Sequence, residues 1–580
     1  MRAVKRALVS EPFLLFDDAR ADAAPARLYR RPQRVIVAKS SDDVLPCLDE
    51  LAAAVRAGAH AAGFLAYEAG CALDPVLATA ARRGDGPLLW FGLFDGFERV
   101  SAPDWLPPAD GAHASAPVPR IVRSDYLAAA ARVREHLFAG DFYQANLTFG
   151  CDVAVAGDPL ALYARLRQAS RAGWGGVVRH EGGWLLSLSP EQFFTLRSGA
   201  IEARPMKGTA PLSDPPEALT GDDKSRAENL MIVDLLRNDL ARVAEPGSVA
   251  VPELFAVETY PTLRQMVSRV TARLRPGLDA VDVLRTIFPC GSVTGAPKVA
   301  AMLALRELEP EPRGAYTGAM GWIEPGGDAS FNVLIRTLAI ADGQPTARLG
   351  LGSGLVVDSQ AGNEWAECLA KGAFVTAAQP GIDLIETMRF DPHEGVIELD
   401  RHLERLRQAA SALGFRFDRH AARNELQAAT FSRKTAGMAR LLLSPTGVMA
   451  VEFREIEPVA ALPVRVALTM LPVPPSDFRL RFKTTDRTFY DQARARGGAF
   501  ETLFVDDQGC LTEGTFSSIF VERGDKLLTP PLSRGLLPGV LRGKLIDEGR
   551  AEEADLTPDD LENGFFVGNI VRGLLPARLA

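Results

Sequence analysis

The spacing of apolar and polar residues along the chain predicts a mixed α and β protein. Apolar residues recur at helical spacing in three segments, 125–139, 224–243 and 400–414. Ser124 suits the N-cap of the first helix, and Gly414 suits the C-cap of the third. Short apolar runs predict strands at 183–188, 347–357, 438–443, 464–471, 501–505 and 516–521. We therefore predict an α+β or α/β fold class.

The pattern is interrupted once, near residue 380, where Pro380 and Gly381 punctuate a linker-like segment. Residues 86–120, rich in Pro, Gly, Ala and Asp, look like a connection inside the longer first region. The domains we predict are an N-terminal lobe at 1–115, a catalytic domain at 116–377, a linker at 378–382 and a second domain at 383–580.

Composition excludes several classes of protein. The 580 residues are 47% hydrophobic and 24% charged, with a net charge of −8 and no block of Lys and Arg, which argues against a nucleic-acid surface. The six cysteines are scattered without a CxxC pair, so neither a disulfide framework nor a zinc site is expected, and a cytoplasmic location fits. No apolar stretch approaches the length of a membrane span.

Two charged residues of the first region lie in apolar context, where functional groups are often found. Glu191 follows a predicted strand in SLSPEQFF, and Lys207 lies in ARPMKGT. Partial desolvation of Lys207 would lower its pKa and free its amine as a nucleophile. The alternative is an ordinary surface lysine in a turn, which is the more common case for a lysine taken at random.

Three further carboxylates, Glu228, Glu364 and Glu367, could converge on Mg²⁺, which prefers oxygen ligands. Glu364 and Glu367 would share one helix face, with Lys371 four residues after Glu367. On spacing alone, exposed ion pairs on a helix face are favoured over a metal site. The Gly-rich string 350–359 does not match a phosphate loop, and its glycines more plausibly allow close backbone approach to a carboxylate.

Eight strings occur in a defined order: GDFYQANLT, SLSPEQF, RPMKGT, RAENLMIVDLLRNDLARV, PCGSVTGAPK, RGAYTGAMG, LIRTL and GSGLVVDSQAGNEWAECLAK. Together they resemble the chorismate-utilising enzymes, the family of anthranilate synthase, isochorismate synthase and aminodeoxychorismate synthase component I. The resemblance covers nearly all of residues 120–375, and GFLAYEAG at 63–70 fits the N-terminal lobe. It implies a two-lobed, β-sandwich-like core with helices.

The resemblance also implies roles for single residues. Glu228 and Glu367 match magnesium ligands, with Glu364 close by. Residues that match the chorismate-binding positions are Tyr316 and Arg336 for the enolpyruvyl carboxylate, and Ser292, Gly352 and Gly354 around the ring carboxylate. Arginine suits a carboxylate partner because the pair can form two charge-assisted hydrogen bonds.

Two positions distinguish members of this family. Lys207 resembles the lysine of the synthases that aminate chorismate at C4, where anthranilate synthases usually have Ala. It would attack C2 and help to expel the C4 hydroxyl, with Glu191 as general acid and base. Gln265 occupies the position at which pyruvate-eliminating relatives carry His. The first region is therefore expected to stop at 4-amino-4-deoxychorismate.

The second region carries the groups that pyridoxal 5'-phosphate (PLP) needs. Lys483 lies in RFKTTDRTFYDQAR after a strand-like run, and Glu513 precedes a predicted strand in LTEGTFSSIFV. The Gly/Pro loop 529–542 leads into a helix, whose N-terminus would bind a phosphate. For Lys483 alone, a solvated lysine is the commoner alternative.

These strings, with LIETMR, DRHLERL and GNIVRGLLP, resemble the fold-type IV PLP enzymes, which include amino-acid aminotransferases and 4-amino-4-deoxychorismate lyase. The resemblance implies Lys483 as the Schiff-base lysine and Glu513 as the partner of the pyridine nitrogen. Arg405, Gly539 and Val540 would bind the phosphate. Ser517 and Ser518 depart from the usual Ser-Asn pair.

We therefore expect a bifunctional enzyme that makes 4-aminobenzoate, a folate precursor, from chorismate and ammonia. The alternatives are a fused amino-acid aminotransferase, an anthranilate synthase, or an inactive subunit that binds a partner. No cysteine lies in a GxCxGxQ-type string, so a separate glutamine amidotransferase subunit is expected to supply ammonia. The resemblance of the second region also suggests a homodimer formed through the PLP domain.

Overall fold

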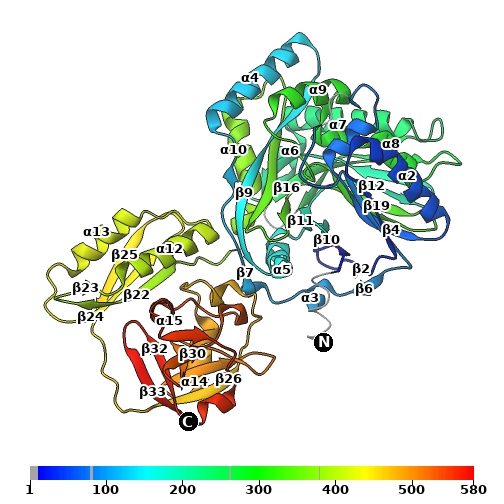
Figure 1. The fold of residues 1–580 in the computed structure, drawn as a ribbon. Coiled ribbons are helices and arrows are strands. Elements are labelled where there is room, and N and C mark those ends of the chain that lie inside the picture. The colour runs from blue at the N-terminus through cyan, green and yellow to red at the C-terminus, as the bar shows by residue number, and fades with distance from the viewer. Residues whose placement is uncertain (1–10, 79–81, 260–262, 378) are drawn as a thin grey trace. The chain divides into compact units, whose positions relative to one another are not determined.

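The computed structural model describes residues 11–78, 82–259, 263–377 and 379–580 (Figure 1). The chain forms two compact units. The first contains Met1–Pro107, Ala116–Val153 and Tyr163–Ala378, and the second contains Pro108–Ser115, Ala154–Leu162 and Gln379–Ala580. Within the described ranges, no helix is both long and apolar enough to cross a membrane.

Two large sheets make up most of the first unit. One has the order β17-β9-β21-β20-β11-β10-β1-β2-β6, with β7 and β8 also paired to β9. Its strands are β17 (Gly295–Ala296), β9 (Gln144–Gly157), β21 (Thr346–Leu355), β20 (Thr337–Ala341), β11 (Gly183–Ser189), β10 (Trp174–His180), β1 (Phe13–Asp17), β2 (Ala26–Arg30), β6 (Glu98–Val100), β7 (Ala112–Ala114) and β8 (Val118–Pro119). β7 pairs with the last residues of β9, and these two segments cluster with the second unit.

The other sheet has the order β14-β16-β13-β12-β19-β18-β4-β5-β3, with β15 also paired to β16. Its strands are β14 (Met206–Pro211), β16 (Leu263–Arg273), β13 (Ala200–Arg204), β12 (Gln192–Arg197), β19 (Ala329–Val333), β18 (Ala319–Ile323), β4 (His60–Leu65), β5 (Leu89–Phe94), β3 (Arg34–Ala38) and β15 (Ala250–Thr259). β5 lies within the stretch expected to be a connection, and all of its residues are buried.

The inner faces of the two sheets pack together. One apolar cluster joins Leu14 and Leu185 of the first sheet to Phe64 and Trp322 of the second. Residues of β4 alternate between this cluster and the opposite face of their sheet. There Leu65 joins a core that includes residues of the helices α2 (Ser41–Arg56), α7 (Asp223–Ala241) and α8 (Ala280–Ile287). This alternation is the period-two pattern of a strand buried on both faces, and it produces the expected sandwich.

The helices of the first unit confirm the predicted segments. They are α2 (Ser41–Arg56), α3 (Ala102–Trp105), α4 (Arg123–Ala139), α5 (Pro159–Ser170), α6 (Pro216–Thr220), α7 (Asp223–Ala241), α8 (Ala280–Ile287), α9 (Lys298–Leu308), α10 (Ala361–Gly372) and α11 (Phe374–Ala377). The predicted cap of α4 was wrong: Val122 is the N-cap, and Ser124 lies inside the first turn. Asp222 caps α7, because its side chain accepts the N–H of Ser225.

The second unit contains two sheets. A four-stranded sheet, β23-β22-β24-β25, packs against α12 and α13. Its elements are β22 (Leu384–Asp391), β23 (Gly395–Val396), β24 (Gly437–Leu443), β25 (Met449–Arg454), α12 (Leu399–Leu413) and α13 (Arg419–Thr430). Gly414 ends α12 with a φ of 72°, as the sequence predicted.

An eight-stranded sheet with the order β28-β27-β26-β33-β32-β29-β30-β31 forms the rest of the second unit. Its elements are β26 (Val464–Met470), β27 (Glu501–Val505), β28 (Leu511–Gly514), β29 (Ser518–Arg523), β30 (Lys526–Thr529), β31 (Ala551–Glu553), β32 (Phe565–Asn569), β33 (Gly573–Leu579), α14 (Thr488–Gly497) and α15 (Val540–Asp547). One predicted detail was wrong: a 3₁₀ turn at Phe478–Leu480, not a strand, precedes Lys483. Glu513 lies inside β28 and precedes the predicted strand, which is β29.

Candidate active sites

The first site contains a buried acid. Glu191 follows β11 and Pro190, and its neighbours on both sides are strands, so the backbone that carries it is fixed. Ser292, in the 3₁₀ turn Gly291–Val293, donates its hydroxyl to Glu191 Oε1 at 2.5 Å. Burial raises the pKa of Glu191, and the hydrogen bond from Ser292 opposes that rise. A carboxyl that retains its proton closer to neutral pH can act as both acid and base.

Lys207 lies on β14 rather than in a turn. Burial, followed by the positive charge of Lys371, lowers the pKa of Lys207. Three carboxylates act against that shift, those of Glu191, Glu228 and Glu367. The lysine is therefore close to these predicted site residues, and its amine is easier to deprotonate than that of a surface lysine.

The glycines of β21 leave room for side chains from other segments. A Cβ at Gly350 would overlap the ring of Tyr316, and one at Gly352 would lie 2.7 Å from the side chain of Thr148. A Cβ at Gly354 would lie 2.8 Å from Gln144 Nε2 and 3.4 Å from Lys207 Nζ. The glycines thus leave space for side chains from other segments, and their predicted approach to a substrate carboxylate stays a prediction.

Gln144 is a site residue that the sequence reasoning missed. Its side chain is buried, and both polar atoms of its amide lack a hydrogen-bond partner within the described part of the chain. A buried polar group without a hydrogen-bond partner destabilises the folded state, so such a group suggests a functional role. The side-chain amide of Gln144 and the amine of Lys207 both lie next to Gly354. Gln144 belongs to the string GDFYQANLT, which the sequence had matched to the family.

Tyr316 and Arg336 lie on two loops that are held together by the backbone. Thr317 and Arg336 both have left-handed backbone, with φ of 61° and 49°. The N–H of Thr317 donates to Leu334 O, and the N–H of Leu334 donates to Gly318 O. Non-glycine residues with positive φ cost about 1–3 kcal/mol each, so the surrounding structure must stabilise these loops.

A buried ion pair supplies part of that stabilisation. Arg313 forms two hydrogen bonds with the carboxylate of Glu309, at 2.7 and 3.0 Å. Its other N–H groups donate to Val293 O, beside Ser292, to Asn146 O on β9 and to Thr317 Oγ1. One guanidinium thus connects three walls of the site.

The N-terminal lobe also helps to hold the loop that carries Arg313. Glu68, in the string GFLAYEAG, accepts the backbone N–H groups of Arg313 and Gly314 at 2.6 and 3.0 Å. Burial raises the pKa of Glu68. The sequence had matched this string to the family without giving it a role.

Two of the three predicted magnesium ligands, Glu364 and Glu367, make different contacts. Glu364 is buried and accepts Ser359 Oγ at 2.8 Å, whereas Glu367 is exposed and pairs with Lys371 Nζ at 2.8 Å. Lys371 also donates to Gly352 O at 3.0 Å. Among the described residues, no group of three or more His, Cys, Asp or Glu side chains is placed to hold a metal ion. No step is therefore derived through a metal ion.

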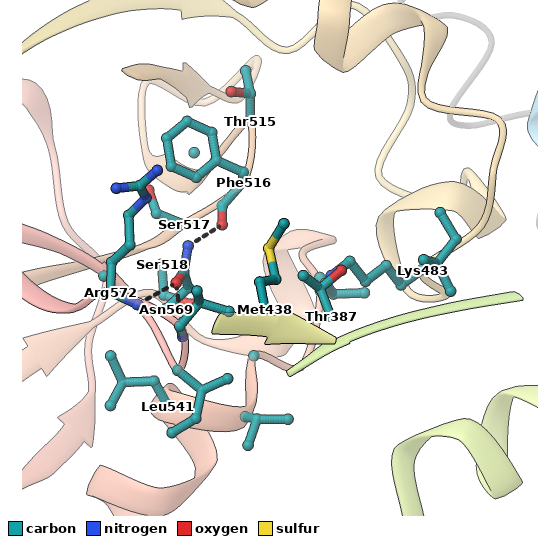
Figure 2. A pocket seen from close by; sticks show the side chains of 18 of the residues that line it. Thr387, Met438, Lys483, Thr515, Phe516, Ser517, Ser518, Leu541, Asn569 and Arg572 are labelled. Carbon is teal, nitrogen blue, oxygen red and sulfur yellow. Dashed lines mark hydrogen bonds between the residues drawn. The ribbon is translucent and has the colours of Figure 1, made fainter. Parts of the chain in front are cut away.

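The second site is a cavity of about 620 Å³ in the second unit (Figure 2). The predicted residues that line it are Arg405, Lys483, Glu513, Ser517, Ser518, Gly539 and Val540. Lys483 Nζ donates to Thr387 Oγ1 at 2.9 Å. Burial, then the charge of Arg405, lowers the pKa of Lys483 to about 7.

Glu513 lies deep in this cavity. It accepts the hydroxyl of Tyr490 at 2.6 Å and the N–H of Leu537 at 3.1 Å. Burial raises the pKa of Glu513 to about 7. A carboxyl with this pKa can share a proton with a pyridine nitrogen.

Gly539 is the N-cap of helix α15, and no side chain caps this N-terminus. A Cβ at Gly539 would lie 2.8 Å from Ser518 Oγ, so glycine and a serine hydroxyl face each other at the first turn. Free N–H groups at this end suit a phosphate. Ser517 instead donates to Glu501 at 2.6 Å, which leaves Ser518 as the hydroxyl at the phosphate end.

Arg405 also lines the cavity, but its guanidinium is held by a buried carboxylate. Its Nε and Nη2 donate to Glu386 at 2.8 and 2.6 Å, and its Nη1 donates to Pro538 O beside Gly539. His402 Nδ1 lies 2.6 Å from Glu386 Oε2. The sequence missed the Glu386–His402 pair, although His402 lies in the matched string DRHLERL. Together the lysine, the carboxyl and the uncapped helix fit PLP.

Comparison with known proteins gives a family match for each of the two regions of the chain. A profile of the chorismate binding enzyme family matches residues 11–377, and one of the class IV aminotransferases matches residues 383–580. Aminodeoxychorismate synthase component 1 of Klebsiella aerogenes is 44% identical over 256 residues, which are 43% of this chain and 56% of the relative. Anthranilate synthase component 1 of Methanothermobacter thermautotrophicus is 37% identical over 260 residues, which are 44% and 56% of the two chains.

The fold is shared with solved structures. The crystal structure of anthranilate synthase component I from Streptococcus pneumoniae TIGR4 superimposes with a TM-score of 0.50 at 23% identity, covering 64% of this chain and 91% of that one. The chain spans only about half the length of the curated relatives, 56% for each of the two compared.

Proposed function

This chain belongs to the chorismate binding enzyme family, and we propose that it converts chorismate and ammonia into 4-aminobenzoate in two steps. The first unit replaces the C4 hydroxyl of chorismate with an amino group. The second unit removes pyruvate from the resulting 4-amino-4-deoxychorismate. The observations that carry this proposal are, in the first unit, a lysine of lowered pKa close to a buried glutamate of raised pKa and, in the second unit, a cavity lined by both Lys483 and Glu513.

In the first unit, Lys207 is the nucleophile. Its neutral amine adds at C2 of the ring, both ring double bonds shift, and the C4 hydroxyl leaves as water after protonation by Glu191. Ammonia then adds at C4, both double bonds shift back, and the C2–N bond breaks to release the neutral amine of Lys207, while the new C4 ammonium passes a proton to Glu191. The balance is chorismate plus ammonia to 4-amino-4-deoxychorismate plus water.

Tyr316, Arg336 and Ser292 bind the two carboxylates in this proposal, and the Arg313–Glu309 pair holds the loops that carry them. Gln144 lies beside Lys207 Nζ, with amide groups available to orient the substrate or the incoming ammonia. Magnesium, which the family commonly uses, and a glutamine amidotransferase subunit remain parts of the proposal.

In the second unit, the buried groups support PLP chemistry. When bound, PLP acts as an electron sink for the carbanion formed at C4 of the substrate. Lys483 holds the cofactor and then removes the proton at C4, because its amine is partly neutral at pH 7. Glu513 holds a proton at the pyridine nitrogen. Loss of pyruvate makes the ring aromatic and provides the driving force.

Two other functions are less well supported. An anthranilate synthase is disfavoured by Lys207 and by Gln265, which lies on β16 opposite Thr209. The higher identity to the aminodeoxychorismate synthase, 44% against 37%, agrees. An amino-acid aminotransferase in the second unit remains the nearest alternative, because the class IV profile covers both chemistries.

Two lysine variants test the proposal. Lys207→Ala is expected to lose covalent capture of chorismate while still converting added 4-amino-4-deoxychorismate. Lys483→Ala is expected to accumulate that intermediate and to form no aromatic product. Formation of 4-aminobenzoate by Lys483→Ala would contradict the lyase assignment, and amination by Lys207→Ala would contradict the nucleophile.

A further inference from the structure

The cavity of the second unit has two arginines without a carboxylate partner on the wall away from Lys483. Arg494, on α14, and Arg572 both line the cavity. Within the described residues neither forms an ion pair, whereas Arg454, on the same cavity, pairs with Glu452 at 2.6 Å. Figure 2 shows Arg572 and Lys483 on opposite sides of the cavity.

Arg572 is fixed by the turn that joins β32 to β33. The side-chain oxygen of Asn569 accepts the N–H groups of Val571 and Arg572, each at 3.0 Å. Gly573 completes the turn with a φ of 70°. Asn569 Nδ2 also donates to Phe516 O at 3.2 Å, as Figure 2 shows, so the turn is anchored to the neighbouring wall.

Aromatic rings hold both guanidinium groups. That of Arg494 lies 4.6 Å from the ring centre of Phe516, and that of Arg572 lies 5.9 Å from that of Phe500. The two rings contact each other edge to face at 5.7 Å. Arg572 Nη1 donates to Glu457 O at 2.7 Å. A guanidinium held on a ring still presents N–H groups at its edge, which suits a planar anion.

Other arginines already serve the region around Lys483. Arg440, on β24, is the register partner of Thr387, to which Lys483 donates, and its Nε is buried without a hydrogen-bond partner in the described structure. Arg487, four residues after Lys483, has its guanidinium 4.4 Å from the ring centre of Tyr490. A carboxylate next to the reacting amine would therefore meet positive charge without Arg494 or Arg572.

A monocarboxylic α-amino acid has its only carboxylate next to the amine, so it would leave Arg494 and Arg572 unused. 4-Amino-4-deoxychorismate has a second carboxylate on C1, across the ring from the amine on C4. We infer that Arg572, assisted by Arg494, binds this ring carboxylate and selects amines with a carboxylate para to the amino group. This inference rests on the proposed lyase function and distinguishes it from an amino-acid aminotransferase.

The test uses the full chain loaded with PLP and measures the absorbance of the bound cofactor. The protein is titrated separately with 4-aminobenzoate and with aniline, which lacks the carboxylate. Wild-type protein is expected to bind 4-aminobenzoate more tightly than aniline by about tenfold or more, the effect of one charge-assisted hydrogen bond. Arg572→Gln and Arg494→Gln are expected to reduce this preference, Arg572→Lys to restore part of it, and the control Arg454→Gln to leave it unchanged.

With 4-amino-4-deoxychorismate as substrate, Arg572→Gln is expected to raise KM by about tenfold with little change in kcat, since the arginine contributes binding far from the reacting C4. An unchanged preference for 4-aminobenzoate in both glutamine variants would overturn the inference. Failure of wild-type protein to form 4-aminobenzoate would overturn the proposed function instead, and the titration would still report on the carboxylate site.

Discussion

The amine of Lys483 is expected to be about half neutral at pH 7. Its pKa is lowered from the usual 10.5 to about 7, first by burial and then by Arg405, Arg487 and Arg440. An ordinary lysine would have only about 1 neutral amine in 3000 at that pH. The amine of Lys483 is mostly neutral at a pH above its pKa, and only the neutral amine reacts with PLP. The rate of PLP binding should therefore rise with pH and level off above pH 7.

The assay is the rate at which the cofactor-free chain binds PLP, followed by absorbance after rapid mixing between pH 5.5 and pH 9. The expected rate rises about tenfold per pH unit below pH 7 and reaches a plateau near pH 8. Lys483→Ala is the control without the amine. Glu513→Gln is the second control, because the pKa of Glu513 is also raised to about 7.

Removing one positive charge tests the electrostatic cause. Arg440→Gln is expected to move the midpoint of the rate profile to higher pH, since this guanidinium is one of the charges that lower the pKa of Lys483. A rate that continues to rise through pH 9 in wild-type protein would refute the reasoning. So would a midpoint near pH 7 that disappears in Glu513→Gln.

Three other predictions concern the first unit. Ser292→Ala is expected to raise the pKa of Glu191 further, because it removes a hydrogen bond that lowers it, and to shift the corresponding limb of the pH profile of amination to higher pH. Glu309→Gln leaves its buried arginine partner uncompensated, so denaturant unfolding should show a loss of about 3–5 kcal/mol, against less than about 1 kcal/mol for Glu311→Gln in an exposed pair. Gln144→Leu should leave the melting temperature unchanged or raise it, since the amide has no partner, and should slow amination; normal amination would show that the amide serves no function.

Local patterns in the sequence predicted most of the elements. The helix ending at Gly414 and the strands of both regions follow from apolar periodicity and turn residues, which act over a few residues. The predicted cap at Ser124 failed because Val122, not the serine, begins the helix, and the run before Lys483 became a 3₁₀ turn although it looked like a strand. Such boundaries depend on tertiary packing more than on composition.

The ordered sequence strings identified the site residues. They could not identify the contacts among these residues, which join distant parts of the chain. Ser292 reaches Glu191 across 101 residues, and Glu68 reaches the backbone of Arg313 across 245. Gln144 was invisible in the sequence because only the structure shows that its amide has no partner. Spacing on one helix predicted an ion pair such as that of Glu367 with Lys371, but it did not decide that Glu364 is buried and Glu367 exposed.

The most direct test of the two-step function is the identity of the product. The purified chain is incubated with chorismate, ammonium, Mg²⁺ and PLP, and the aromatic product is identified by mass and fluorescence. Equal amounts of 4-aminobenzoate and pyruvate are the predicted result. Anthranilate would contradict the role of Lys207, and 4-amino-4-deoxychorismate that accumulates without an aromatic product would contradict the lyase function of the second unit.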